Sequence, residues 1–191
     1  MVNLLPLEEG ERVTSILPVE EYAEGHYIFM ATANGTVKKT ALMDFARPRS
    51  VGLRALHLDE GDVLVGTAIT TGDCDVMLFS SEGKAVRFNE ADVRAMGRTA
   101  RGIRGIRLGE AHSMISLIIP QAQGMVLTVS ENGYGKRTRL EEFPTKGRGG
   151  KGMIAMSTSA RNGTMVGAVQ VFEGDELMLI SNQGTLVRTR T

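Results

Sequence analysis

The chain has 191 residues, of which 42% are hydrophobic and 23% are charged, and this balance excludes an intrinsically disordered protein. Its 22 basic and 22 acidic side chains cancel, and a net charge of zero taken alone argues against nucleic-acid binding. No apolar run reaches the roughly 18 residues of a membrane helix, and the N-terminus lacks a signal-peptide pattern. The single cysteine, Cys74, cannot form an internal disulfide, which is typical of a reducing cytosol.

Four stretches share one pattern: an apolar run, a turn that ends in glycine, and a second run that closes on Lys or Arg. They begin at residues 27, 76, 125 and 177, and steps of 48, 50 and 51 residues separate their turn glycines, Gly35, Gly83, Gly133 and Gly184. The runs are rich in Val, Ile, Leu and Thr, which predicts a β-hairpin in each stretch. Asn34-Gly35 and Asn132-Gly133 predict tight two-residue turns with positive φ at their centres.

Two further apolar segments recur between the hairpins. One set begins at residues 53, 103 and 153, and the other at residues 63, 114 and 165. The unit is therefore about 50 residues long with four short strands, and residues 90–96 are expected to form at most one helical turn. A repeated four-strand unit predicts an all-β protein of β-propeller-like blades.

The repeats predict one domain made of consecutive blade units. Residues 27–75, 76–124 and 125–176 are expected to be three repeats, while 1–26 end a preceding blade and 177–191 begin a further one. Two arrangements of the ends stay open. Residues 1–26 and 177–191 either pair to close a small ring or leave open strand edges.

The neutral total hides a strongly uneven distribution of charge. Windows after the hairpins, residues 36–54, 84–107 and 134–152, hold 18 of the 22 basic residues and 5 of the 22 acidic ones. Their net charge is +13, and the rest of the chain carries −13. The candidate DNA-binding side chains are Lys38, Lys39, Arg47, Arg49, Arg54, Lys84, Arg87, Arg94, Arg98, Arg101, Arg104, Arg107, Lys136, Arg137, Arg139, Lys146, Arg148 and Lys151.

Equivalent loops of neighbouring blades lie side by side, so these windows predict a curved basic stripe. Such a stripe suits the backbone of duplex DNA, because each neutralised phosphate releases counterions and adds affinity that does not depend on sequence. Aromatic residues are only 5% of the chain, which disfavours single-strand binding by base stacking. No recognition helix is expected, so we predict bending of duplex DNA rather than reading of base edges.

The loop Lys146-Gly-Arg-Gly-Gly-Lys-Gly152 is the sharpest single motif. Its glycines allow close approach to an anion while its cations supply charge. Gly147, Gly149 and Gly152 match a dinucleotide fingerprint in spacing, but a strand is expected to follow the loop where that motif needs a helix. A P-loop fails as well, because Gly follows Lys151.

Several of these segments together resemble one known family. Residues 2–8, 30–40, 94–97, 105–110 and 132–138 closely resemble the C-terminal domain of bacterial DNA gyrase A subunits, and the resemblance runs the whole chain. It implies a six-bladed β-pinwheel with strands exchanged between blades, of which this chain covers roughly two-thirds. It also implies that duplex DNA wraps a basic rim in support of negative supercoiling. The implied partners are the rest of gyrase A together with the gyrase B subunit, in a bacterial cytoplasm.

The family's hallmark is a gyrase A box, Gln-Arg-Arg-Gly-Gly-Lys/Arg-Gly, which is expected upstream of this chain. The loop resembles it at Arg148, Gly149, Gly150, Lys151 and Gly152 but has Lys146 and Gly147 in the first two places. The resemblance to the gyrase A box therefore covers only those five positions. The alternatives are the equivalent domain of topoisomerase IV and a propeller-like protein-interaction module.

Other candidate chemistry is sparse. The three histidines are scattered singly, Cys74 has no base near it in the sequence, and the acidic clusters at 59–62 and 173–176 lack the ligand spacing of a calcium loop. We therefore predict no catalytic residue, no metal and no cofactor in this chain, which would form the non-catalytic part of an ATP-dependent type II topoisomerase.

Overall fold

The computed structural model describes residues 7 and 9–191, and every regular element in that part of the chain is a strand or a short 3-10 turn. Residues 1–6 and 8, part of the expected end of a preceding blade, lie outside the described residues. The prediction of an all-β protein is confirmed. The elements are β1 (Tyr27–Thr32), β2 (Thr36–Ala41), η1 (Leu42–Phe45), β3 (Leu64–Thr70), β4 (Asp75–Ser80), β5 (Lys84–Asn89), η2 (Glu90–Asp92), β6 (Ile103–Arg104), β7 (Met114–Ile118), β8 (Met125–Ser130), β9 (Gly135–Arg139), η3 (Leu140–Glu142), β10 (Met153–Ile154), β11 (Met165–Val171), β12 (Glu176–Ile180) and β13 (Leu186–Arg190).

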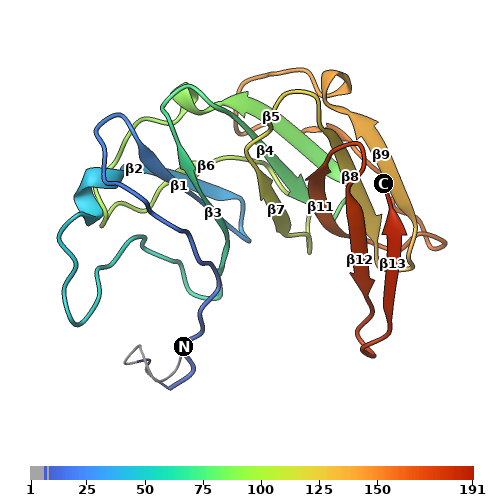
Figure 1. Cartoon of the computed structure of the whole chain (residues 1–191), viewed down its shortest axis with the longest axis horizontal. Helices are drawn as coiled ribbons and strands as arrows, with labels where there is room; N and C mark the ends of the chain where they lie inside the picture. Colours follow the sequence, from blue (N-terminus) through green and yellow to red (C-terminus); the bar gives the residue numbers. More distant parts are fainter. Residues whose placement is uncertain (1–6, 8) are drawn as a thin grey trace.

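Strands of successive repeats combine into four antiparallel sheets. Their strand orders are β3-β1-β2-β6, β10-β5-β4-β7, β11-β8-β9 and β12-β13. The two complete sheets each take their outermost strand from the following repeat, as β6 and β10 cross to pair with β2 and β5. Figure 1 shows the sheets along an arc, with β3, β7 and β11 toward its concave side and β2, β5 and β9 toward its convex side.

The four hairpins form where the sequence predicts them, but the prediction of a two-residue turn is wrong. In the first hairpin Ala31 pairs with Val37, and the Gly35 amide donates to the Thr32 carbonyl at 2.9 Å. Positive φ occurs at Gly35 and not at Asn34. The turn therefore has its left-handed residue last, as in a three-residue loop with a glycine bulge, and the residue before glycine is free to vary.

Two apolar clusters hold the arc together across blade boundaries. One includes Phe29, Val37 and Phe88 from the first and second sheets. The other includes Phe79 from the second sheet, Met165 from the third and Phe143 from the segment after η3. The rings of Phe79 and Phe143 meet edge-on with 6.2 Å between centroids. Because each cluster draws on two repeats, neighbouring blades stabilise one another.

The described ends of the chain lie apart. Segment 9–26 runs along the first sheet, where Ser15 Oγ and Thr67 Oγ1 are 2.5 Å apart, and it forms no strand. Strands β12 and β13 pair only with each other among the described residues. The sequence allowed either a closed ring or unpaired strand edges, and the described residues of the two ends do not pair into a ring. Residues 53–58 also form no strand, unlike their counterparts at 103 and 153.

Short 3-10 turns follow the outer strand of each of the first three hairpins. The turn η2 lies within the stretch predicted to contain one, and the Asn89 side chain caps it by accepting from the Ala91 amide at 2.8 Å. No sequence pattern pointed to η1 and η3, which lack a side-chain cap. No helix in the described part of the chain is long and apolar enough to cross a membrane.

Candidate nucleic-acid interface

The predicted basic residues lie on the outer strands and on the loops that follow them, but not all of them face solvent. Three are half-buried, Lys84, Arg87 and Arg98, and two are buried, Lys38 and Lys39. Thirteen are exposed: Arg47, Arg49, Arg54, Arg94, Arg101, Arg104, Arg107, Lys136, Arg137, Arg139, Lys146, Arg148 and Lys151.

Lys38 is the clearest exception to the sequence prediction. Its side chain is completely buried, and its ammonium donates to the carbonyls of Ala55 at 2.8 Å and Arg98 at 2.5 Å. Burial, together with the Arg98 charge, lowers the pKa of the Lys38 ammonium. The prediction that Lys38 contacts DNA is wrong, because the side chain instead joins two loops of successive repeats.

Lys39 is also an interior residue. Its ammonium donates to the Glu90 carbonyl at 2.9 Å, lies 3.6 Å from the Glu90 carboxylate and sits 4.9 Å from the centre of the Tyr27 ring. Glu90 is fully buried, and its carboxylate accepts from the Thr70 hydroxyl and from the amides of Gly72 and Cys74. The prediction for Lys39 is therefore wrong as well, since a buried paired cation cannot reach a phosphate.

Arg87 stands at the position of Lys39 in the second hairpin and makes comparable contacts. Its guanidinium donates to Asp75 Oδ2 at 2.7 Å and to the carbonyls of Leu140 and Phe143 at 3.1 Å each. The guanidinium thus bonds the carbonyl of the first residue of η3 and that of the residue after η3. Arg137 occupies this position in the third hairpin, where it is exposed and makes no such contact among the described residues.

Some of the outward cations are paired with acids. Arg101 meets Asp59 at 2.5 Å, and Lys84 donates to Glu82 at 2.7 Å. The hydrogen bond from Lys84 lowers the pKa of the Glu82 carboxyl. In surface pairs of this kind the cation readily exchanges its carboxylate for another anion, because each pair contributes little energy.

Backbone bonds hold the loop of residues 146–152, the box-like loop, against β5 of the second sheet and against the segment that follows β6. The Lys146 amide donates to the Arg87 carbonyl at 2.8 Å, and the Gly149 amide donates to the Gly105 carbonyl at 2.7 Å. The Arg148 guanidinium donates to the carbonyls of Asp92 at 2.9 Å and Arg104 at 3.1 Å. Arg148 thus connects the end of η2 with β6 from an exposed position, while Lys146 and Lys151 stay free of ion pairs within the described chain.

The glycine that ends the loop is required by its surroundings. Gly152 has a φ of +76°, and a Cβ there would lie 2.5 Å from the Ala85 carbonyl oxygen. Gly102, 50 residues earlier, has the same relation to the Val37 carbonyl at 2.6 Å. Both glycines let a short crossing strand pack onto the outer strand of the preceding hairpin.

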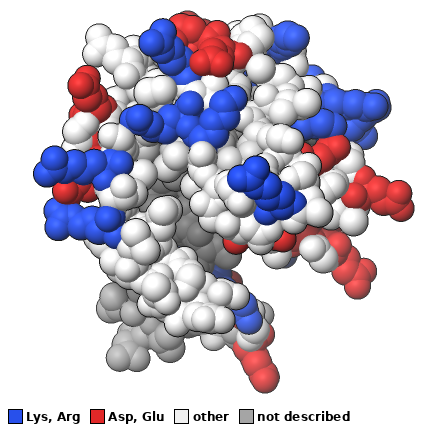
Figure 2. All heavy atoms as spheres, turned by 90° about the vertical axis from the view of Figure 1, so that its right-hand side faces the viewer, with Lys and Arg blue, Asp and Glu red and all other residues white. Residues whose placement is uncertain are grey.

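Figure 2 shows the end of the arc that carries the last sheets. Lys and Arg side chains are spread mainly over the upper part of this face, and Asp and Glu side chains lie mainly around its edges. Sequence reasoning missed the four basic residues outside the three windows, which are Arg12, Arg188, Arg190 and Arg161. Arg161 packs on an aromatic ring. It is exposed, its guanidinium lies 4.9 Å from the Tyr134 ring centre, and its Nε donates to the Tyr134 hydroxyl. No sequence signal pointed to this pair.

Comparison with known proteins decides the family. A model of the DNA gyrase C-terminal domain, described as a beta-propeller, matches residues 26–71, 75–121, 124–171 and 175–191. The chain belongs to this family. The resemblance predicted from the sequence is confirmed, and the match falls into four successive units.

Relatives with known names agree with this assignment. The chain is 58% identical over 190 residues to the A subunit of DNA gyrase from Salmonella typhimurium and 57% identical to that of Escherichia coli, with all of this chain and 22% of each relative covered. It thus spans less than a quarter of the length of these relatives.

Solved structures match over nearly the whole chain. The DNA gyrase A C-terminal domain has a TM-score of 0.87 at 28% identity, with 99% of this chain and 64% of that chain covered. The C-terminal domain of DNA topoisomerase IV has a TM-score of 0.91 at 23% identity, covering 99% of this chain and 59% of that one. The second match shows a common fold.

Proposed function

We propose that this chain binds duplex DNA through its phosphate backbone and bends it along the convex side of the arc. The observation that carries the proposal is the recurrence of exposed cations on the outer side of successive repeats. Thirteen of the eighteen predicted residues are exposed, on the outer strands or in the segments that follow them, and the buried Lys38 and Lys39 join successive repeats. Membership of the gyrase C-terminal family supports the same conclusion.

The blade units at 27–75, 76–124 and 125–176 would act as successive supports for the duplex. In the complete protein the chain would be the DNA-wrapping part of gyrase A, within an ATP-dependent type II topoisomerase of the bacterial cytoplasm. The remainder of gyrase A and the gyrase B subunit would be its partners, because supercoiling needs their cleavage and ATPase sites. The loop 148–152 would contribute charge through Lys151, since Arg148 already bonds two carbonyls.

The test is a titration of the purified chain against end-labelled duplexes of two unrelated sequences over a series of salt concentrations. We expect equal affinity for both sequences and a steep loss of affinity with salt, because each phosphate contact contributes a slope of about −0.9 in log K against log salt. Charge reversal at Arg101, Arg104 or Lys151 should weaken binding to both duplexes.

Arg12→Glu is the matched control, since Arg12 is exposed but lies in the segment before the first sheet. It should weaken binding far less than Lys151→Glu. Binding that does not respond to salt, or equal losses in the control and the rim variants, would contradict the proposal.

A further inference from the structure

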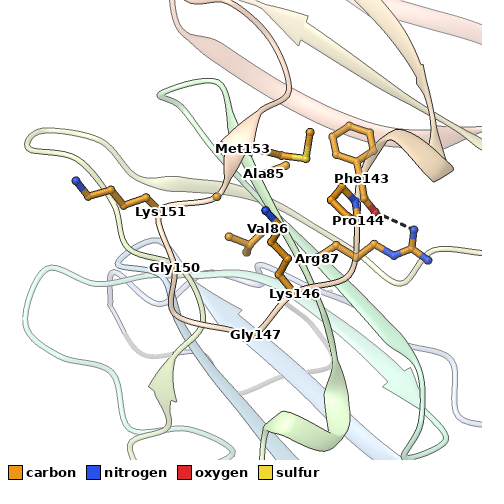
Figure 3. Close-up of a pocket in the computed structure, with 11 residues that line it drawn as sticks. Ala85, Val86, Arg87, Phe143, Pro144, Lys146, Gly147, Gly150, Lys151 and Met153 are labelled. Atoms are coloured by element: carbon orange, nitrogen blue, oxygen red, sulfur yellow. Dashed lines mark hydrogen bonds between the residues drawn. The ribbon is translucent and has the colours of Figure 1, made fainter.

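A hollow of about 220 Å³ lies beneath the box-like loop, between β5, the chain after η3 and the start of β10. Its walls are mainly apolar, with Val86, Phe143, Pro144 and Met153 among them. Figure 3 shows the Lys146 side chain extended across the hollow with its ammonium beside Val86, while Lys151 points away from it. One cation therefore stands over an apolar floor.

Comparison of the repeats explains why the hollow exists here. Val86 lies three residues after the turn glycine Gly83, as Lys38 lies three residues after Gly35. In the first sheet the long Lys38 side chain passes between the loops and bonds the Ala55 and Arg98 carbonyls. Valine is too short to do so, and space remains between the strand and the loop. The loop closes instead through the bond from Gly149 to Gly105.

The charges around the hollow differ in availability. Arg87 is occupied by Asp75 and by the Leu140 and Phe143 carbonyls, as the dashed line to Phe143 in Figure 3 illustrates. Lys146 is exposed and has no ion pair among the described residues. A bound anion would therefore meet the Lys146 ammonium and leave the Arg87 contacts intact.

We propose that this hollow binds a small aromatic carboxylate, with its ring against Val86, Phe143 and Met153 and its carboxylate on the Lys146 ammonium. A dry cavity of about 150 Å³ is enough for one benzene ring, so this volume suits one or two fused rings. An apolar body buried in a pocket with a single oriented polar contact is the usual form of a small-molecule site. No role in the DNA proposal requires these apolar side chains.

A consequence for DNA rests on the proposed function. A carboxylate on Lys146 neutralises one of the exposed cations of the loop, so one positive charge fewer remains to attract the phosphates. The bound molecule should thus weaken DNA binding, and more so at low salt, where electrostatic terms are largest.

The experiment is an NMR titration of the methyl-labelled chain with 1-naphthoate, and with 1-naphthylmethanol as the neutral probe. Saturable shifts are expected at the methyl groups of Val86 and Met153, with tighter binding of the carboxylate. Val86→Met fills the hollow and should abolish both responses while the rest of the spectrum stays unchanged. Lys146→Gln should weaken naphthoate about tenfold and leave the alcohol unaffected, whereas Lys136→Gln should change neither.

Shifts that never saturate, that spread over the whole surface, or that survive Val86→Met would overturn the site. Equal affinity for the acid and the alcohol would overturn the role of Lys146. The DNA proposal fails separately, because it requires salt-dependent DNA binding in the absence of naphthoate. If naphthoate binds as expected but leaves the affinity for DNA unchanged, the site stands and only the predicted weakening of DNA binding is overturned.

Discussion

Two junctions between repeats hold this arc together, and they achieve it with different chemistry. At the first junction the buried Lys38 ammonium joins the carbonyls of Ala55 and Arg98. At the second, Val86 takes the place of the lysine, and a glycine-rich loop bonds directly from Gly149 to Gly105. Two neighbouring repeats can therefore be joined either by a long buried cation or by a glycine-rich loop that approaches closely enough for a backbone hydrogen bond. Because of this difference, the cation of the first junction is buried, whereas Lys146 at the second junction stays exposed to a ligand.

Gly83→Ala should break the second junction and give the largest effect. A Cβ at Gly83 would overlap the Met156 carbonyl oxygen, and the Gly83 carbonyl accepts from the amides of Ala155 and Met156. Backbone strain of about 1–2 kcal/mol at positive φ and about 1 kcal/mol for each of the two weakened hydrogen bonds add to a loss of about 3–4 kcal/mol. Urea unfolding measures it.

Gly133→Ala is the matched control for that change. Gly133 ends the same turn with a φ of +81°, but a Cβ there meets nothing within 4 Å. Only the backbone strain should remain, a loss of about 1–2 kcal/mol. Equal losses at the two glycines would show that the crossing strand does not impose the requirement.

Lys38→Met tests the first junction. The variant leaves the Ala55 and Arg98 carbonyls without the ammonium, but it also removes the cost of burying a charge, so we expect a net loss of about 1–2 kcal/mol in unfolding free energy. Lys136 is the corresponding residue of the third hairpin and is exposed. Lys136→Met should lie within about 0.5 kcal/mol of the parent. A Lys38→Met variant with the same unfolding free energy as the parent would contradict the bridging role.

The pH dependence of stability sharpens the same comparison. The pKa of Lys38 is lowered in the folded chain, so over the range between its folded and unfolded values the unfolded chain binds more protons. The Lys38 contribution to unfolding free energy therefore rises with pH through this range. Subtracting the Lys38→Met profile from the parent profile in alkaline urea titrations should give a positive slope. A flat or negative difference would contradict the cause assigned to the shift.

Lys84→Met should give the smallest effect. Lys84 donates to Glu82, whose pKa is lowered in the folded chain, so this pair adds stability above the unfolded pKa and loses it as pH falls through the folded one. The loss at neutral pH should be below about 1 kcal/mol for a partly exposed pair. An NMR titration of the Glu82 carboxyl should show its pKa rising in the variant, and an unchanged value would exclude Lys84 as the cause.

The sequence predicted the hairpins and the inner strands because each carries enough apolar residues to show a pattern. The apolar pattern alone could not place β6 and β10 in the preceding sheets, since two-residue strands have no periodicity, and only the family resemblance implied an exchange of strands. Nor could the sequence separate Lys38 and Lys39 from the exposed cations. Their partners, Arg98 and Glu90, lie 60 and 51 residues further along the chain, and only the folded junction brings them together. The charge counted in each sequence window therefore overstates the number of cations that DNA can reach.

The most direct test of DNA bending along the convex side is energy transfer between dyes on the two ends of a duplex. A duplex of about 60 base pairs is well below the persistence length of about 150 base pairs and is nearly straight when free. Saturation with the chain should raise the transfer efficiency, and Arg104→Glu with Lys151→Glu should remove the rise at matched occupancy, while Arg12→Glu preserves it. A duplex that is fully bound without any change in transfer efficiency would contradict the account.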